Sequence, residues 1–213
     1  MSEFIITTYD WVPEVPRGYV RDLRLRWAAE EGQLPYRVES TSFQDRGPDH
    51  FAKHPFGQAP MLTHKDQTIF ESGAALLYLG EQSDKLMPTD QARRYNVTQW
   101  VFAALNSMEM ASVPWSLFKF SGTDNDQSGY PMFDNFLTSR LTNLEKALAE
   151  REWLTDQFSV ADIAMVDVLR LIDRFDGLAG YPTCRALKER GEARPAFIKA
   201  HADQLAHFKR GDG

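Results

Sequence analysis

The first part of the chain alternates between short apolar segments and longer segments whose apolar residues recur at helical spacing. The short segments are rich in β-branched and aromatic residues, which indicates strands at 4–9, 37–42, 61–63 and 68–70. The longer segments predict a helix over 18–31, a short helix or turn over 47–54, and a helix that starts near Ser72. Their order along the chain is β-α-β-α-β-β-α, which is typical of an α/β domain.

The second part has no strand-like alternation, and apolar residues recur there at helical spacing. Three such stripes are Val97, Val101, Leu105 and Met108; Phe133, Leu137, Leu141, Leu144 and Leu148; and Ile163, Val166, Leu169 and Ile172. Two more helices are predicted at 183–190 and 195–208, and the polar segment 121–131 is predicted to be a loop. We therefore predict an α/β domain over 1–82 and an all-helical bundle over 92–213, joined by a linker.

Composition and charge argue against several classes of protein. The 213 residues are 43% hydrophobic and 25% charged, as in an average globular protein, and the formal net charge of −6 argues against a general nucleic-acid binder. The only cysteine, Cys184, allows no intramolecular disulfide and no paired-thiol metal site. No apolar run reaches the length of about 18 residues that a membrane span needs, and the N-terminus lacks the features of a signal peptide. We expect a cytoplasmic protein without a membrane anchor or a bound metal.

The string Pro-Phe-Gly-Gln-Ala-Pro at 55–60 carries the strongest chemical signal. Ala59 precedes a proline, which pushes its backbone into an extended conformation. An extended backbone with a free N–H and C=O can pair with another extended peptide. Pro60 is a candidate cis proline in a tight turn, which would expose that backbone edge.

A second signal, Glu71-Ser72-Gly73, follows eleven residues after that string, where a helix is predicted to begin. The unpaired N–H groups and the positive dipole end of a first helical turn bind carboxylates well. The Ser72 hydroxyl adds a donor and Glu71 can hold an ammonium group, so together they match the α-amino acid end of a ligand. Read more simply, Ser72 is an N-cap and Glu71 interacts with the helix dipole.

With these motifs the sequence resembles the cytosolic glutathione transferase family over nearly its whole length. The second half matches at 158–164, where Ser159 and Asp162 form a predicted capping box, and at 193–197. The resemblance implies a thioredoxin-like N-terminal domain, an all-α helical-bundle C-terminal domain and a homodimer. It also implies glutathione as co-substrate and a detoxifying transferase activity toward a small electrophile, without a metal.

The resemblance assigns the contacts to the γ-glutamyl and cysteinyl parts of glutathione residue by residue. The γ-glutamyl contacts fall at Glu71 and Ser72. The backbone contacts to the cysteinyl part fall at Ala59, before Pro60, where the family more often has valine.

The glycyl carboxylate is assigned to Gln58 and Arg46, where plant-type members have a glutamine and a lysine. A guanidinium suits this role because it grips carboxylates with two N–H groups. Arg46 can also be read as a solvated loop charge. Lys53 and His54 are further groups within possible reach of that carboxylate.

The group that activates the thiol departs from the family pattern. Family members use a tyrosine, serine or cysteine near the end of the first strand or the start of the first helix, but residues 10–39 contain no serine, threonine or cysteine. We expect Arg17 and backbone N–H groups at the helix start to stabilise the thiolate, and we expect Trp11 to form one wall of the site. The alternatives are a hydroxyl of Tyr9 or Tyr19, and an ordinary solvated helix face for the arginines at 17, 21, 24 and 26.

The leading functional hypothesis is conjugation of glutathione to an electrophile, or glutathione-dependent peroxide reduction. The alternative is a non-catalytic glutathione- or partner-binding module on the same fold. Exchange through a protein thiol is disfavoured, because Cys184 lies far from the motif and is expected to be buried or idle. One set of apolar residues is read as an electrophile pocket or as helix core: Met108, Met110, Trp115, Phe118 and Phe120.

Overall fold

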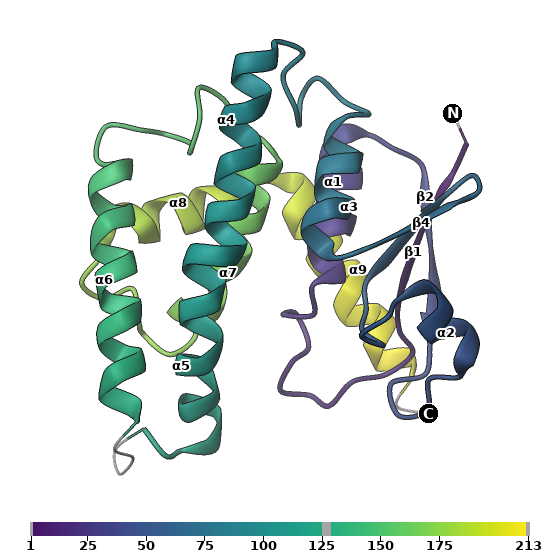
Figure 1. Ribbon diagram of the computed structural model, residues 1–213, viewed down its shortest axis with the longest axis horizontal. Helices are drawn as coiled ribbons and strands as arrows, with labels where there is room; N and C mark the ends of the chain where they lie inside the picture. Colours follow the sequence, from purple (N-terminus) through teal and green to yellow (C-terminus); the bar gives the residue numbers. More distant parts are fainter. Residues whose placement is uncertain (1, 125–128, 212–213) are drawn as a thin grey trace. The chain divides into compact units, whose positions relative to one another are not determined.

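The computed structural model describes residues 2–124 and 129–211 and divides the chain into two compact units (Figure 1). The first unit contains residues 1–88 together with 194–213, and the second contains residues 89–193. The sequence predicted domains of 1–82 and 92–213, whereas this division groups residues 194–213 with the first unit. Within the described residues, no helix is long and apolar enough to cross a membrane.

The first unit is built on a four-stranded sheet in the order β2-β1-β3-β4. Strands β1 (Phe4–Tyr9) and β2 (Tyr36–Thr41) are parallel, whereas β3 (Met61–His64) runs antiparallel to β1 and β4 (Gln67–Phe70) antiparallel to β3. Helices α1 (Asp22–Gly32), α2 (Pro48–Lys53) and α3 (Ser72–Gly80) complete the predicted order. The thioredoxin-like β-α-β-α-β-β-α pattern is therefore confirmed.

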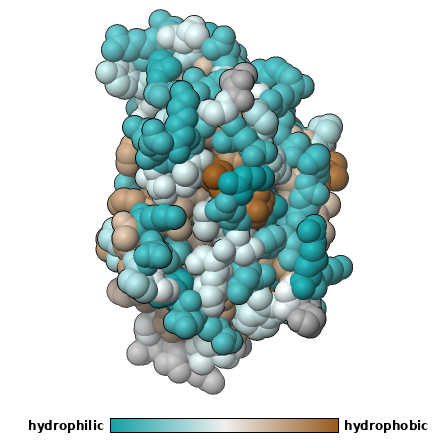
Figure 2. All heavy atoms as spheres, turned by 90° about the vertical axis from the view of Figure 1, so that its right-hand side faces the viewer, coloured by the Kyte–Doolittle hydropathy of each residue, from teal (hydrophilic) through white to brown (hydrophobic). Residues whose placement is uncertain are grey.

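The edge strand β2 is polar, and its residues alternate between partly buried and exposed positions. Arg37 on this strand pairs with the carboxylates of Glu3 and Glu39. Charged side chains on an edge strand discourage pairing with another chain. Figure 2 shows that the face of the molecule on this side is largely hydrophilic, with hydrophobic atoms at the surface only in small patches.

Helix α1 begins later than the sequence predicted. The helical spacing suggested a start at Gly18, but residues 14–20 form turns and the helix begins at Asp22. Gly18 has a φ of 82°, a left-handed value that an α-helix does not contain. A Cβ at this position would also lie 2.8 Å from Nε2 of His201 on the last helix, so a residue without a side chain is required.

The last helix, α9 (Pro195–Arg210), belongs to the first unit because it packs along α1. The rings of Trp27 and Phe197 meet edge to face at 5.0 Å. Nη2 of Arg194 donates to the Glu31 carboxylate at 2.8 Å, and Nε2 of Gln204 donates to a backbone carbonyl before α1 at 2.9 Å. These contacts between residues far apart in the chain explain why helical spacing alone could not place α9.

The second unit is entirely helical among its described residues, as predicted. Its elements are α4 (Gln91–Phe102), the π-helical segment η1 (Ala103–Glu109), α5 (Met110–Ser121), α6 (Tyr130–Leu148), α7 (Val160–Asp173) and α8 (Pro182–Glu192). The predicted loop 121–131 falls between α5 and α6, and its residues 125–128 lie outside the described residues. Helical spacing alone did not distinguish the π-helical turn in the stripe beginning at Val97 from a continuous α-helix.

Helix α7 is the centre of the second unit, and its N-terminus carries the predicted capping box. Oγ of Ser159 accepts a hydrogen bond from the backbone N–H of Ala161 at 3.2 Å, and Asp162 Oδ2 accepts from the Ser159 N–H at 2.9 Å. The other oxygen of Asp162 accepts from the Leu154 N–H at 2.9 Å. The carboxylate therefore fixes both the helix start and the segment before it.

Candidate functional site

The corner between β4 and α3 has the geometry of an anion site. Ser72 is the first residue of α3, and Glu71 before it has φ 68° and ψ 119°. A non-glycine residue with positive φ is strained, and such strain often accompanies function. Glu71 occupies the N-cap position without a side-chain cap bond. The alternative reading of Ser72 as the N-cap is therefore wrong.

The Ser72 hydroxyl is buried and is engaged by an arginine that the sequence did not indicate. Nη1 of Arg24, on α1, donates a hydrogen bond to Ser72 Oγ at 3.1 Å. Arg24 is 1% exposed and Arg26 is 3% exposed, so these two arginines do not form a solvated helix face. A pairing between residues 48 positions apart could not be read from local sequence.

The segment that leads into β3 presents the backbone edge that the sequence predicted. The Ala59–Pro60 peptide bond is cis. Within the described part of the chain, the N–H and C=O of Ala59 enter no hydrogen bond. Gly57, at φ 61°, is packed under Phe51 of α2, where a Cβ would lie 2.4 Å from the ring. This edge is therefore available to an extended ligand backbone.

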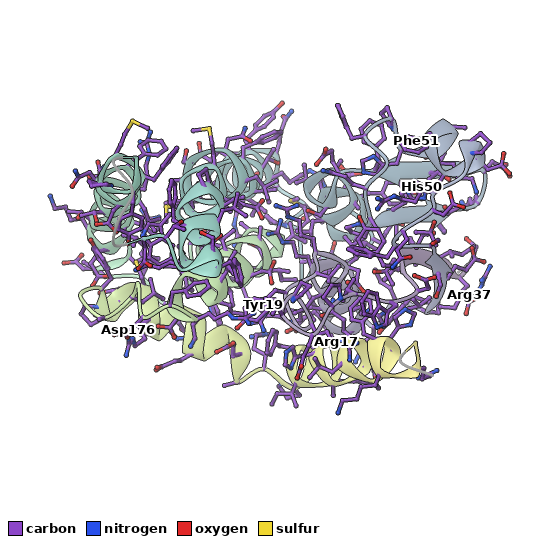
Figure 3. The ribbon with its side chains drawn as sticks, turned by 90° about the horizontal axis from the view of Figure 1, so that it is seen from below. Arg17, Tyr19, Arg37, His50, Phe51 and Asp176 are labelled. Atoms are coloured by element: carbon purple, nitrogen blue, oxygen red, sulfur yellow. The ribbon has the colours of Figure 1, made fainter. Side chains whose placement is uncertain are left out.

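His50 of α2, which is labelled in Figure 3, holds the segment before β3 in place. The sequence did not identify His50 as a site residue. Its Nε2 lies 3.0 Å from the carbonyl oxygen of Gln58, and its Nδ1 lies 3.1 Å from the hydroxyl of Thr41. Because a carbonyl can only accept, we assign the ring proton to Nε2, so that Thr41 donates to Nδ1. The side chain of Gln58 remains exposed.

His54, an alternative cation for the glycyl carboxylate, is buried instead of facing solvent. It is 2% exposed, and its ring lies 5.2 Å from that of Phe70 and 6.3 Å from that of Phe56. Burial lowers the pKa of His54, against the opposing influence of the Glu71 carboxylate. A neutral, enclosed imidazole is a poor partner for a carboxylate, so His54 is disfavoured in this role.

Arg46 lies over the ring of Tyr9 at the end of β1, with its guanidinium carbon 5.4 Å from the ring centroid. The ring of Tyr9 also meets Phe43 edge to face at 5.2 Å, and Phe43 contacts the ring of Trp11 at 6.1 Å. Arg46 is therefore half-buried against an aromatic cluster. The Arg46 side chain is therefore more constrained than a solvated loop charge, which was the alternative interpretation.

Arg17 lies in the loop before α1 and not in the helix. Its Nε and Nη2 donate to the carbonyl of Val12 at 3.2 and 3.1 Å. Figure 3 shows Arg17 beside α9, away from His50 and Phe51. The expected location of Arg17 at the helix start is therefore wrong, because the intervening residues form turns.

The start of α1 already carries a negative group. Asp22 is fully buried, and its carboxylate accepts from Nε of Arg26 at 2.7 Å and from the amide of Gln204. Burial raises the pKa of Asp22, although Arg26 and Gln204 oppose this effect. A buried carboxylate of the protein itself therefore lies at the positive end of the α1 helix dipole.

Of the apolar residues read as an electrophile pocket or as helix core, Met108 and Trp115 belong to the core of the second unit, whereas Met110 and Phe120 are exposed. Met108 and Trp115 are buried, and the Trp115 indole donates to Asp134 Oδ1 at 2.8 Å. Cys184 is buried, as expected, and its N–H donates to Glu145 at 2.9 Å. Burial raises the pKa of the Cys184 thiol well above its usual range, so this thiol is not a reactive nucleophile.

Comparison with known proteins agrees with this geometry. The N-terminal domain model of glutathione S-transferases matches residues 9–81, and a C-terminal domain model of the same family matches residues 112–203. A crystal structure of a glutathione transferase family member from Pseudomonas fluorescens, with two glutathione bound, superimposes with a TM-score of 0.80 at 26% identity. It covers 93% of this chain and 92% of that one.

Two curated relatives align over shorter stretches. Glutathione S-transferase 1 of Schizosaccharomyces pombe is 27% identical over 150 residues, which are 65% of this chain and 66% of that protein. Glutathione S-transferase GstA of Escherichia coli O157:H7 is 28% identical over 131 residues, which are 59% of this chain and 63% of that protein. The alignments thus span just under two thirds of each relative's own length. The matched domains and the common fold establish that this chain belongs to the cytosolic glutathione transferase family.

Proposed function

We propose that the protein binds glutathione in its first unit and presents the thiolate to small electrophiles, as a cytoplasmic glutathione transferase. The observation that carries the proposal is the pairing of an anion site at Ser72 with an unpaired extended edge at Ala59. A γ-linked peptide with a free amino acid at one end needs both features. The glutathione-bound relative supports the same assignment.

Each part of glutathione has a proposed partner. The α-carboxylate of the γ-glutamyl residue binds the Ser72 hydroxyl and the free N–H groups of the first turn of α3, and its ammonium group binds Glu71. The cysteinyl backbone pairs with Ala59, next to Pro60. The glycyl carboxylate binds Gln58 and Arg46, whose orientation the Tyr9 ring restricts.

The chemical step that we propose is nucleophilic attack by the glutathione sulfur. With an aryl halide, a sulfur–carbon bond forms, halide leaves as an anion, and the thiol proton passes to solvent. With a hydroperoxide, two glutathione molecules are oxidised to the disulfide while the peroxide is reduced to an alcohol and water. The protein lowers the thiol pKa and holds the two reactants together.

We assign stabilisation of the thiolate to Arg17, with Trp11 shielding the sulfur from water. A guanidinium stays charged at neutral pH, so it favours the thiolate over the thiol. The contacts of Arg17 with Val12 restrain the guanidinium at the loop that carries Trp11. Helix α1 begins only at Asp22, whose carboxylate is paired with Arg26, so we propose Arg17 in the preceding loop as the positive group.

Replacing Arg17 with alanine should raise the pKa of bound glutathione by about one unit or more, because a permanent positive charge is lost. The thiolate, and hence turnover, would then be reached only at higher pH. The measurement is the pH dependence of kcat, which reports ionisation in the bound complex. Tyr9→Phe and Tyr19→Phe are the controls and should move the profile little. A shift in either tyrosine variant without one in Arg17→Ala would identify a tyrosine as the activating group.

Glutathione titration combined with steady-state kinetics tests the proposed function as a whole. We expect binding together with turnover of an aryl halide, a hydroperoxide or both. Saturable binding without turnover of either would favour the alternative, a non-catalytic glutathione-binding module. Absence of binding would contradict the proposal itself.

We further propose that the protein forms a homodimer in which Phe56 is an anchor. Phe56 lies in the glutathione-binding string and is 69% exposed, an unusual position for a phenyl ring. The second unit has an apolar cavity of about 170 Å³ bounded by α4, η1, α6 and α7. A cavity of about 150 Å³ can hold a benzene ring, so the cavity of a second copy has room for this side chain.

Replacing Phe56 with serine should therefore shift the protein from dimer to monomer at micromolar concentrations. Sedimentation velocity measures the change. Ile198→Ser is a matched control, because Ile198 is an exposed apolar residue of α9 at 57% exposure and lies outside the proposed contact. A Phe56 variant that stays as dimeric as the Ile198 variant would contradict the assignment.

A further inference from the structure

His50 connects the end of a strand to the segment that carries the proposed ligand edge. It belongs to α2 and is 8% exposed (Figure 3). With the ring proton at Nε2, His50 donates to the Gln58 carbonyl at 3.0 Å. Its Nδ1 accepts from the hydroxyl of Thr41, the last residue of β2, at 3.1 Å. Because both ring nitrogens are engaged, the imidazole is held in one tautomer and one orientation.

The carbonyl that His50 holds determines where the next N–H group points. The carbonyl of Gln58 and the N–H of Ala59 belong to one planar peptide unit, and this unit is trans. In a trans unit the C=O and N–H point in opposite directions. Because the carbonyl points toward His50, the Ala59 N–H points away from it. The direction of the proposed ligand edge therefore depends on this hydrogen bond.

Separate contacts hold the chain on the two sides of Ala59. After Ala59 the chain enters β3, which pairs with β1. Before it, the Gly57 N–H donates to the His54 carbonyl at 2.8 Å, which closes the turn independently of the imidazole. Within residues 2–124 and 129–211, His50 is the sole hydrogen-bond partner of the Gln58 carbonyl. Loss of the imidazole should therefore free this peptide plane while the turn and the sheet stay in place.

We infer that His50 is a positioning residue that aims the Ala59 N–H at the cysteinyl carbonyl of glutathione, and that it acts through the Gln58 carbonyl. This inference rests on the proposed function. A correctly directed N–H fixes the cysteinyl residue, and with it the sulfur that reacts. Ligands that lack the cysteinyl carbonyl gain nothing from His50.

His64 provides an internal comparison, because it is a second buried histidine of the first unit with both ring nitrogens engaged. It is 7% exposed; its Nε2 lies 2.6 Å from the Ser2 hydroxyl, and its Nδ1 lies 2.8 Å from the Tyr78 hydroxyl. Neither partner belongs to the proposed glutathione site. A His64 variant therefore reports the cost of removing a buried imidazole that is not directed at the ligand edge.

The test compares two ligands in the full-length protein by calorimetric titration. One is glutathione, and the other is an analogue in which a trans alkene replaces the cysteinyl–glycyl amide, so that the cysteinyl carbonyl is lost without a change of charge. The wild-type protein should bind glutathione more tightly than the analogue. His50→Leu should weaken glutathione binding about three- to tenfold, as expected for one neutral hydrogen bond, and should change binding of the analogue less than about twofold.

His64→Leu is the matched control and should leave the ratio of the two affinities unchanged. A merely structural role of His50 would weaken both ligands alike. Equal loss for both ligands in His50→Leu, or no loss for either, would therefore overturn the inference.

Two polar variants keep the test decisive if His50→Leu does not fold. His50→Gln carries an amide N–H near the position of Nε2, so it should keep the preference for glutathione within about twofold of the wild-type value. His50→Asn carries its amide near the position of Nδ1, too short to reach the Gln58 carbonyl, and should lose most of that preference. Loss of the preference in His50→Gln, or its retention in His50→Asn, would contradict the assigned role.

Failure of the proposed function is distinguishable from failure of this inference. If the wild-type protein binds neither ligand, the glutathione site itself is wrong, and the inference falls with it. If it binds both ligands equally, the cysteinyl carbonyl is not the partner of Ala59, and the inference is wrong although a glutathione site exists. If it prefers glutathione and the leucine and asparagine variants keep that preference, only the role of His50 is wrong.

Discussion

Glutathione should bind about ten- to a hundredfold more weakly when Ser72 is replaced by alanine, while the protein remains folded. A hydrogen bond to a charged group contributes roughly 1.5–3 kcal/mol, and the Ser72→Ala variant removes the proposed one. The variant should still fold, because the substitution removes no helix cap and keeps the backbone N–H groups of the first turn of α3 in place. Removal of the hydroxyl also leaves Arg24 without this hydrogen-bond partner in α3.

Titration calorimetry measures the affinity, and thermal unfolding reports whether the fold is intact. Ser116→Ala is a matched control, because Ser116 is a buried serine of the second unit whose hydroxyl donates to the carbonyl of Val113 at 2.8 Å. It should leave the glutathione affinity unchanged. An unaltered affinity in folded Ser72→Ala would remove Ser72 from the site.

Replacing Asp162 with alanine should lower the free energy of unfolding by about 2–5 kcal/mol. The carboxylate accepts from the N–H groups of Leu154 and Ser159, and both residues are buried. Each donor left unsatisfied costs roughly 1–3 kcal/mol. Asp156→Ala is the control, because that side chain is 76% exposed and should matter little. Denaturant unfolding measures the difference, and equal stability of the two variants would contradict the account of the capping box.

The same residue should give a recognisable pH dependence of stability. Burial raises the pKa of Asp162 from an ordinary 3.8 to about 6 in the folded protein. Between these values the folded state holds more protons than the unfolded state, so the contribution of this group to stability falls as pH rises through that range. The Asp162→Ala variant should lose this component of the slope. An identical slope in both proteins would contradict the assigned pKa.

The sequence predicted those parts of the fold that depend on local patterns. Alternation and helical spacing identified the strands and most of the helices, and the Ser159–Asp162 box marked the start of α7 correctly. The start of α1 was misplaced because helical spacing extends back to Gly18, whose φ of 82° lies outside the helical region, and local spacing does not show this. The position of α9 depends on contacts with α1 that join opposite ends of the chain.

In the candidate site too, residues with a local sequence signature were predicted, and residues that depend on distant contacts were missed. Glu71 and Ser72 at the start of α3 and the cis bond before Pro60 were predicted, because each is a local signature. Arg24 and His50 were missed as site residues. Arg24 belongs to a run of charged residues, and such runs on a helix are usually solvated. The hydrogen-bond partners of Arg24 and His50 could not be inferred from the sequence around either residue. The burial of His54 likewise depends on rings contributed by separate segments.

A crystal structure of the protein with glutathione bound would show the proposed contacts themselves. The γ-glutamyl carboxylate should lie within hydrogen-bond distance of the Ser72 hydroxyl, with the cysteinyl backbone paired to Ala59. The sulfur should lie on the side of Arg17 and Trp11. Glutathione bound elsewhere, or bound here in reverse with its glycyl carboxylate at Ser72, would contradict the proposal.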